Sequence, residues 1–461
     1  ERGKMSSKII RILLPILATA FLIMYGCGKN RVLELKKEKL FSIPIGRSEE
    51  QIGVQRRQNG EFHGPGAVLF RNGFFFVVDG VNQKIMKITT PGDIILVISK
   101  GNNPGNTGRE ADNVLRTKER KIYNFDTISQ IAVDNENNLY VQNVFIKKEK
   151  QESVIDIISL DDNVGDEGAN YTESYMSYIL KFDRLGNFKY RIGKNGINTD
   201  PFYYVYKIAT DLNGNLIILT ADEAWENWTY YVYDNEGKLI ERHTINREKI
   251  LGSNKPVDRV SFIMDVCPEV NDKKLVYWVS QYETTNDTKS IKKSEDAWGE
   301  EIEIENFDET KSTDQSVKKS MNDLLFYKLV RFDVTSDDII SSYTWETGLN
   351  HSTDTTQEFL GIDGKSDGFL WKYVGKNRSV VTIVRPDGTV VAKRSFSFED
   401  DGLWTNVQVA VDGSVYAIKI DDKKAYFYRW RSDELLGAKR EKIGVRDFIL
   451  EKIEEFKNAN R

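Results

Sequence analysis

The stretch GFFFVVDGVNQKIMKITTPGD, residues 73–93, decides the fold. An aromatic and valine run ends at Asp79, a few polar residues follow, and a second alternating run ends at the Pro-Gly-Asp of residues 91–93. Runs of β-branched and aromatic residues that are separated by Asp, Asn and Gly predict antiparallel strands joined by tight turns. The question is whether this is one hairpin or one copy of a repeat.

The remaining sequence indicates a repeat. The same order of strand-like runs and turns recurs, interrupted by inserts, in six units: residues 65–99, 128–193, 206–245, 259–345, 358–397 and 404–431. Asn/Asp-Gly turns separate the runs, for example at 213–215, 235–237, 386–388 and 411–413. Between residues 60 and 431 no long helical stripe occurs. Four antiparallel strands per unit, at a period of about 40 to 50 residues without inserts, predict an all-β, six-bladed β-propeller.

The last unit contains only three strands, and the segment 39–46 before the first unit has strand character. We therefore expect residues 39–46 to supply the missing strand and close the ring, which removes free sheet edges. A β-sandwich is the alternative for so many short strands. The propeller would span residues 39–431, with polar surface loops inserted at 146–174 and 283–320. Residues 432–461 are expected to form a helical tail, with Val445, Ile449, Ile453 and Phe456 at helical spacing.

The N-terminal segment has the layout of a secretion signal. Lys8 and Arg11 precede an apolar run at 12–25, and Gly26 precedes Cys27. The Gly-Cys pair resembles the lipobox of bacterial lipoproteins, in which the cysteine becomes the acylated N-terminus. The resemblance implies that residues 1–27 are a signal peptide, that Cys27 is the lipidation site, and that residues 28–38 are a tether. An uncleaved N-terminal anchor is the alternative.

The first unit also resembles a known repeat. It carries the pattern of an NHL repeat, and the later units keep its turns but lose its Asn; the matching residues are Phe62, Pro65, Val78, Asp79, Asn82, Ile85 and Ile88. As a whole, the chain is similar to six-bladed propeller lipoproteins of spirochaetes. NHL-type propellers mostly act as binding platforms, and a few are enzymes, so the resemblance implies an envelope-located binding protein.

Composition excludes several classes of function. The 461 residues include 65 basic and 70 acidic side chains, and a formal charge of -5 provides no global field for nucleic acid. Three His and two Cys argue against a zinc site and a disulfide framework. If Cys27 is lipidated, Cys267 has no partner within the chain, and we expect it to be a buried packing residue.

Few residues are candidates for chemistry. Asp79, Asp134, Asp211 and Asp412 are expected to cap their own turns. The loop at 161–172 has acidic spacing loosely like a calcium loop, but it lacks Gly at the sixth position and Glu at the twelfth, so no cofactor is expected and calcium is left open. Of the histidines, His63, His243 and His351, none has an acid-base motif beside it. A cluster of Trp225, Trp228 and Tyr230 either faces a ligand, such as a sugar or a partner protein, or packs between blades.

We therefore expect a lipid-anchored propeller of the bacterial cell envelope, on the periplasmic or outer-membrane side, that binds or scaffolds an envelope protein or glycan. The alternative is a metal-dependent propeller hydrolase or lyase, of the lactonase type. Carboxylates that converge on the central channel would favour the enzyme, and an apolar, aromatic or uncharged channel would favour the binding protein.

Overall fold

The computed structural model describes eleven stretches of the chain. They are residues 33–56, 62–101, 119–150, 171–193, 201–222, 226–251, 259–285, 320–346, 357–375, 378–398 and 402–436. The signal segment with Cys27, the interior of both predicted inserts and most of the C-terminal tail lie outside these residues.

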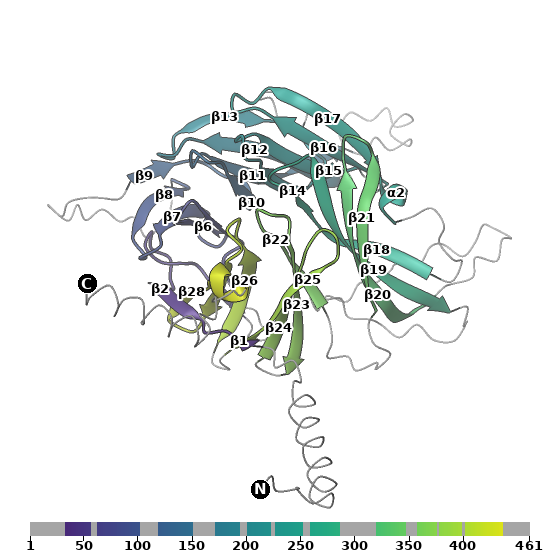
Figure 1. Ribbon diagram of the computed structural model, residues 1–461. Helices are drawn as coiled ribbons and strands as arrows, with labels where there is room; N and C mark the ends of the chain where they lie inside the picture. Colours follow the sequence, from purple (N-terminus) through teal and green to yellow (C-terminus); the bar gives the residue numbers. More distant parts are fainter. Residues whose placement is uncertain are drawn as a thin grey trace, which may run out of the picture.

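The described residues form six four-stranded antiparallel sheets, which we number as blades 1 to 6 (Figure 1). The predicted six-bladed propeller with four strands per blade is confirmed. Blade 1 contains β5 (Ala67–Arg71), β6 (Phe74–Asp79), β7 (Lys84–Thr89) and β8 (Ile94–Ser99). Blade 2 contains β10 (Thr127–Val133), β11 (Leu139–Lys150), β12 (Tyr171–Phe182) and β13 (Phe188–Ile192). Blade 3 contains β14 (Tyr204–Thr210), β15 (Leu216–Ala221), β16 (Asn227–Tyr233) and β17 (Leu239–Asn246).

The second half of the chain repeats this order. Blade 4 contains β18 (Arg259–Pro268), β19 (Lys274–Thr285), β20 (Ser320–Asp333) and β21 (Asp338–Glu346). Blade 5 contains β22 (Gln357–Ile362), β23 (Gly368–Gly375), β24 (Arg378–Val384) and β25 (Val390–Ser397). Blade 6 contains β26 (Leu403–Val409), β27 (Val415–Ile420) and β28 (Lys424–Trp430) from the C-terminal part, and β2 (Glu38–Pro44) from the N-terminal part.

The first strand of each blade is its inner strand. The inner strands β5, β10, β14, β18, β22 and β26 contact one another in a closed circuit, and β26 of blade 6 returns to β5 of blade 1. A β-sandwich would place the sheets in two facing layers. The circuit therefore identifies the radial arrangement of a propeller.

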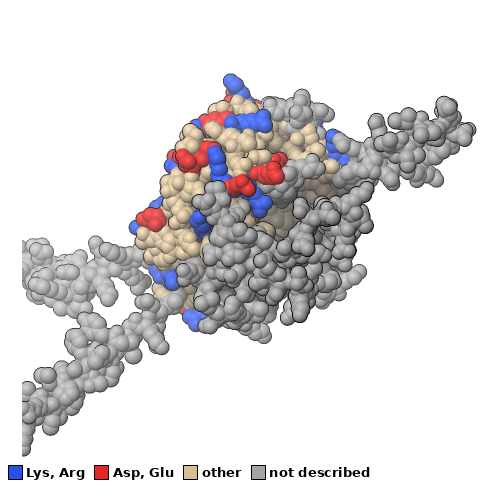
Figure 2. All heavy atoms as spheres, turned by 90° about the vertical axis from the view of Figure 1, so that its right-hand side faces the viewer, with Lys and Arg blue, Asp and Glu red and all other residues tan. Residues whose placement is uncertain are grey.

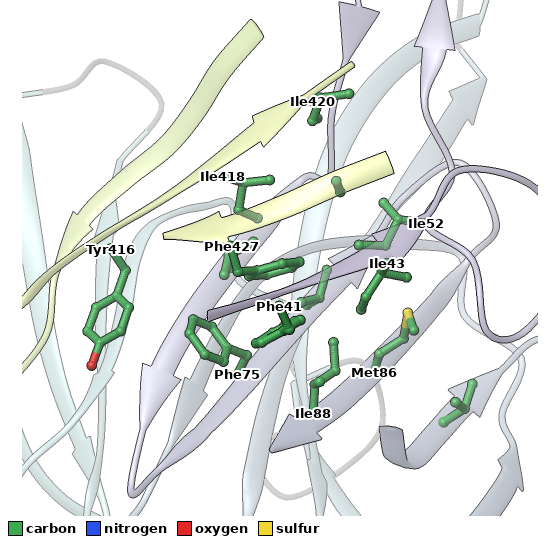
Figure 3. Close-up of a cluster of buried hydrophobic side chains, with 14 of the residues drawn as sticks. Phe41, Ile43, Ile52, Phe75, Met86, Ile88, Tyr416, Ile418, Ile420 and Phe427 are labelled. Carbon is green, nitrogen blue, oxygen red and sulfur yellow. The ribbon is translucent and has the colours of Figure 1, made fainter. Parts of the chain in front are cut away.

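The ring closes in blade 6, where β2 pairs antiparallel with β28, as predicted for residues 39–46. In Figure 1 the purple β2 lies beside the C-terminal strands of this blade. Phe41 of β2 stacks on Phe427 of β28, with ring centroids 4.4 Å apart, and meets Phe75 of blade 1 edge-on at 5.2 Å. Figure 3 shows these rings among the buried side chains of blades 1 and 6. Strand β2 thus joins the two ends of the chain in one core.

Each blade has two kinds of connection, which lie at opposite ends of its strands. The turn between the first and second strands and the turn between the third and fourth strands lie at one end, which we call the turn face. The remaining connections, including those from β11 to β12 and from β19 to β20, lie at the other end, which we call the far face. The predicted turns at 213–215 and 386–388 lie at the turn face, where Gly214 and Gly388 have positive φ angles of 82° and 87°.

The structure differs from the sequence analysis at several boundaries. Strands β11 and β12 stay paired as far as Lys150 and Tyr171, and β19 and β20 as far as Thr285 and Ser320, so both hairpins extend into the predicted inserts. Backbone pairing alone supports such polar extensions, which leave no apolar pattern in the sequence. The interiors, 151–170 and 286–319, lie outside the described residues.

Four short strands were not predicted. Strand β9 (Glu119–Ile122) pairs in parallel with β8, and β1 (Leu33–Glu34) pairs in parallel with β25, so blades 1 and 5 have a fifth strand. A further pair, β3 (Gln55–Arg56) and β4 (Phe62–His63), lies between β2 and β5 in the chain.

The helices of the described residues are short. They are α2 (Arg247–Leu251) and α3 (Ser432–Leu435), whose Leu435 is buried. The predicted tail helix with Val445, Ile449, Ile453 and Phe456 lies outside the described residues. Among the described helices, none has the length and apolar character needed to cross a membrane.

A buried lysine attaches the N-terminal segment to blade 1. Lys84 is fully buried, and its Nζ donates hydrogen bonds to the carbonyl oxygens of Ser48 (2.6 Å), Glu49 (3.2 Å) and Gln51 (2.6 Å). The same Nζ lies 3.6 Å from the carboxylate of Asp79, which is also fully buried. A buried cation with this many acceptors holds the 48–51 segment against β7.

Asp79 also organises its own turn, as predicted. Its Oδ1 accepts from the backbone N–H of Asn82 (3.0 Å), and its Oδ2 accepts from the Asn82 amide (2.8 Å) and from the N–H of Gly53 (2.7 Å). The carboxylate therefore caps the β6–β7 turn and fixes the chain after β2.

We expect Lys84→Met to destabilise the protein by about 3–5 kcal/mol, because it leaves the Asp79 carboxylate buried without its cation and three carbonyls without a donor. The change is measured as the shift in free energy of unfolding of the full chain in guanidinium. Lys238→Met, at an exposed lysine in a turn of blade 3, is the matched control and should change stability little. Equal stability of the two variants would contradict this role for Lys84.

Candidate functional site

The inner strands share an irregularity at mid-length. The pairing register shifts within β10, β14, β18, β22 and β26, and β5 alone pairs without a shift. A bulge re-aims the side chains beside it and is common next to binding sites. In blades 2, 3 and 4 the bulges contain Gln130, Tyr206 and Met264.

These three bulges are connected by hydrogen bonds across the blades. The Gln130 Nε2 donates to the carbonyl oxygen of Tyr206 (2.8 Å), and the Gln130 Oε1 accepts from the N–H of Ile208 (3.3 Å). The Tyr206 hydroxyl donates to the carbonyl oxygen of Met264 (3.1 Å). The Met264 side chain is 48% exposed, an unusual position for a large thioether on an inner strand.

An ion pair lies beside this chain of contacts. Lys207 of β14 and Asp265 of β18 approach to 3.6 Å, and about a third of each side chain is exposed. Burial lowers the pKa of Lys207, whereas the charge and the hydrogen bond of Asp265 raise it, and the net direction is upward. The lysine is therefore cationic at neutral pH, and the pair presents both charges to a ligand.

An exposed tyrosine continues this surface to the far face. Tyr204, at the first position of β14, is 42% exposed, and its ring centroid lies 6.3 Å from that of Tyr206. Tyr206 in turn packs against the buried Trp228 at 4.7 Å. We call Gln130, Tyr204, Tyr206, Lys207, Met264 and Asp265 the axial site. Its side chains are an amide, two phenols, a thioether and one ion pair.

Cys267 does not take part in chemistry at this site. It is 9% exposed and belongs to the core between blades 4 and 5. Burial raises the pKa of its thiol to about 12, so the neutral thiol is present at physiological pH. This confirms the packing role that the sequence predicts.

The turn face is joined by a second set of contacts between neighbouring blades. Turns between the first and second strands are hydrogen-bonded in sequence from blade 1 to blade 6. The bonds are Asn72 Nδ2 to Asp134 O (3.0 Å), Asn135 Nδ2 to Leu212 O (2.5 Å), Leu212 N to Val270 O (3.0 Å), Asn271 Nδ2 to Gly364 O (2.5 Å) and Gly364 N to Val411 O (2.8 Å). This open series of bonds fixes neighbouring blades relative to one another at this end.

The predicted turn-capping aspartates are confirmed. Asp134 and Asp211 each accept two backbone N–H groups and the side-chain amide of the Asn four residues later, at 2.8 Å. Asp412 accepts the N–H of Ser414 at 2.9 Å. These carboxylates are structural, because their oxygens are occupied by their own turns.

Blade 5 departs from this pattern. Asp363 accepts the N–H groups of Lys365 and Asp367, but Asp367 stands where blades 2 and 3 have an amide donor. Both carboxyls are more than nine-tenths buried. Burial, and next the charge of Asp363, raise the pKa of Asp367 to about 6. The turn therefore holds two acidic groups where its counterparts hold an acid and an amide.

The remaining sequence candidates do not converge on a site. Trp228 and Tyr230 are 2% and 1% exposed in the core between blades 3 and 4, so the packing alternative holds for both, and they do not face a ligand. Trp225, Cys27, His351 and the loop at 161–172 lie outside the described residues. His63 lies opposite Gln55 in the β3–β4 pair, and the His243 ring lies 3.4 Å from Glu241. In the described stretches, no three His, Cys, Asp or Glu side chains form a group suited to a metal ion.

Charges of both signs are mixed on the surface. On the face shown in Figure 2, acidic and basic side chains lie next to one another among uncharged residues. A ligand approaching this face meets local pairs of charges instead of a field of one sign.

Comparison with known proteins adds little to this description. No protein-family model and no curated protein sequence matches the chain, so the NHL-like resemblance stays a prediction. Solved structures of similar shape include the Dos1 propeller (9% identity, TM-score 0.35, 88% of this chain and 96% of that one). Others are the β-propeller domain of the Trilobed protease from Pyrococcus furiosus (10%, 0.34, 79% and 94%) and a protein of unknown function from Dyadobacter fermentans (10%, 0.38, 86% and 99%). These TM-scores are too low to carry an argument.

Asp367 makes stability depend on pH. Its pKa in the folded protein is about 6, against an ordinary 3.8. At a pH between these two values, the Asp367 carboxyl is therefore protonated in the folded protein and ionised in the unfolded chain. The contribution of Asp367 to the free energy of unfolding should therefore fall as pH rises from about 4 to about 6. Asp367→Asn restores the amide of blades 2 and 3 and should stabilise the protein at pH 7 by up to roughly 3 kcal/mol.

The measurement is denaturant unfolding of both proteins at pH 4.5 and pH 7.5. The gain from Asp367→Asn should be larger at the higher pH, and Asp338→Asn, at an exposed turn-face position, should show no such difference. A gain that is independent of pH would show that the Asp367 carboxyl is not protonated in the folded state.

Proposed function

We propose that this chain is a lipid-anchored binding protein of the bacterial cell envelope, whose axial site receives a segment of a partner protein. The anchor is supported by the signal layout and by the Gly-Cys pair at residues 26 and 27. The first described residue, Leu33, follows Cys27 by only six positions and already pairs with blade 5. Under this proposal the propeller lies directly beside the membrane.

The observation that carries the binding role is the composition of the axial site. Exposed Tyr204 and Met264 provide apolar contact area, and the Lys207–Asp265 pair provides a donor and an acceptor beside it. Aromatic and Met side chains are enriched at protein interfaces, and a thioether adapts to apolar side chains of different shape. The surface therefore suits a peptide segment with both apolar and polar groups.

A protein partner is favoured over a glycan by the position of the aromatic residues. The sequence motif that suggested stacking on sugars includes Trp228 and Tyr230, and both are buried. Of the two tyrosines of the axial site, Tyr206 is fixed by its hydroxyl and by Trp228 and does not present a free ring face on that side. The NHL-like character of blade 1 agrees with a platform that binds proteins.

The test is photo-cross-linking in the bacterial envelope. A photoreactive phenylalanine replaces Met264 in the full chain, and a matched chain carries it at Leu212, which is equally exposed but lies at the turn face. We expect a discrete protein adduct from position 264 only, and a loss of at least tenfold with Tyr204→Ala/Lys207→Ala, since interface tyrosines often contribute more than about 1.4 kcal/mol.

The adduct is identified by mass spectrometry of cross-linked peptides. A partner peptide joined to position 264 supports the proposal. Adducts that are equal at both positions, insensitive to the double substitution, or glycan in composition would overturn a protein-binding axial site.

A further inference from the structure

Strand β1 shows from which side the N-terminal segment reaches the propeller. It pairs in parallel with β25, with Leu33 opposite Arg394 and Glu34 opposite Ser395. Strand β25 starts at the turn face, at Val390, and runs to the far face, at Ser397. Because the two strands are parallel, β1 also runs from the side of the turn face toward the far face, and its N-terminal end is directed to the turn face.

The length of that segment limits where Cys27 can lie. Six residue steps separate Cys27 from Leu33, which span at most about 20 Å. Leu33 lies four residues along β25 from Val390, about 13 Å, so a straight path would bring Cys27 to roughly 7 Å beyond Val390, the residue at the turn-face end of this strand. A reversal of the chain needs a turn of about four residues, and the remaining reach of about 7 Å is shorter than the distance of about 10 Å to the far end of β25.

The two faces also differ in their exposed side chains. All four exposed tyrosines of the described residues are at the far ends of strands or beside them: Tyr175, Tyr203, Tyr204 and Tyr373. Aliphatic side chains are exposed at both faces. At the far face they are Val81, Ile122, Ile146 and Leu403, and the larger set at the turn face is Leu185, Leu212, Leu239, Ile240, Ile339, Ile340, Val390 and Val411, together with the aromatic Phe188. Tyrosine is typical of protein interfaces, whereas aliphatic side chains provide apolar contact without hydrogen-bonding groups.

Some of the carboxylates at the turn face are buried or engaged within their own turns. Asp134 and Asp363 are buried, and Asp234 accepts the N–H groups of Glu236 and Lys238 in its own turn. The oxygens of these groups are directed to the backbone of the turns. The tips of the turns expose apolar side chains such as Leu185 and Leu212, at 47% and 49%, beside exposed carboxylates such as Glu136 and Glu236.

We propose that the propeller stands on the bilayer that holds Cys27, with its turn face toward the lipid headgroups and its far face, with the four tyrosines including Tyr204 of the axial site, directed away from the membrane. The inference rests on the proposed lipidation of Cys27 and deepens the proposed function, because it states from which side a partner approaches. The partner reaches the tyrosines without passing between the propeller and the membrane.

The test is energy transfer from the protein to the bilayer. The full-length lipoprotein is reconstituted in phosphatidylcholine vesicles that contain a headgroup-labelled acceptor lipid. A maleimide donor dye is attached at Leu212→Cys or Ile340→Cys on the turn face, and at Tyr175→Cys or Tyr373→Cys on the far face. Cys267 is buried and its pKa is raised to about 12, so it should not compete for the dye, and labelling of the unsubstituted protein checks this.

We expect energy transfer at least twofold higher from both turn-face positions than from both far-face positions. Equal transfer from the two sets would mean that the propeller lies on its side, and higher transfer from the far face would mean the reverse orientation; either result overturns the inference while leaving the anchor intact. Failure of the protein to float with vesicles, together with an unmodified Cys27 peptide by mass spectrometry, would overturn the lipid anchor itself and the orientation with it.

Discussion

The pairing of β2 with β28 is the constraint on which the rest of the structure depends. A single four-stranded blade has apolar side chains on both faces and needs a neighbour on each side to bury them. Blades 2 to 5 obtain both neighbours from consecutive chain, but blades 1 and 6 meet only if the chain ends come together. Phe41, which stacks on Phe427 and meets Phe75 edge-on, fills that junction, and Lys84 fixes the segment that follows β2.

In the closed ring, the residues that stabilise the fold and the residues of the axial site lie in different parts of the molecule. At the turn face, short turns are capped by their own aspartates and linked from blade to blade. These contacts leave little freedom to substitute the residues of the turns. At the inner strands, bulges interrupt the regular ladder and expose Met264 and the Lys207–Asp265 pair. A rigid scaffold can hold such irregular positions in place, because the surrounding ladders determine their geometry.

The sequence predicts the features that follow from local rules. Asp-Gly turns and alternating runs reveal the blades, and the missing strand of blade 6 reveals the role of residues 39–46. Strands β1 and β9 leave no signal, since two to four residues are too few for an alternating pattern and can pair through the backbone alone. The sequence could not assign Trp228 and Tyr230 to the core or to a binding surface, because aromatic residues occur in both. Asp367, by contrast, was visible as an Asp in place of the Asn of comparable turns, and its consequence follows from burial.

The most direct test of ring closure is a cysteine cross-link between β2 and β28. Ser42 lies opposite Tyr426, whereas Tyr428 is two residues further along and pairs with Lys39. The account predicts that Ser42→Cys/Tyr426→Cys forms a disulfide in the folded full chain, since directly opposite strand residues fall within disulfide range. The Ser42→Cys/Tyr428→Cys protein should form it much less. Absence of a cross-link in the first protein, or equal cross-linking in both, would contradict closure by β2 in this register.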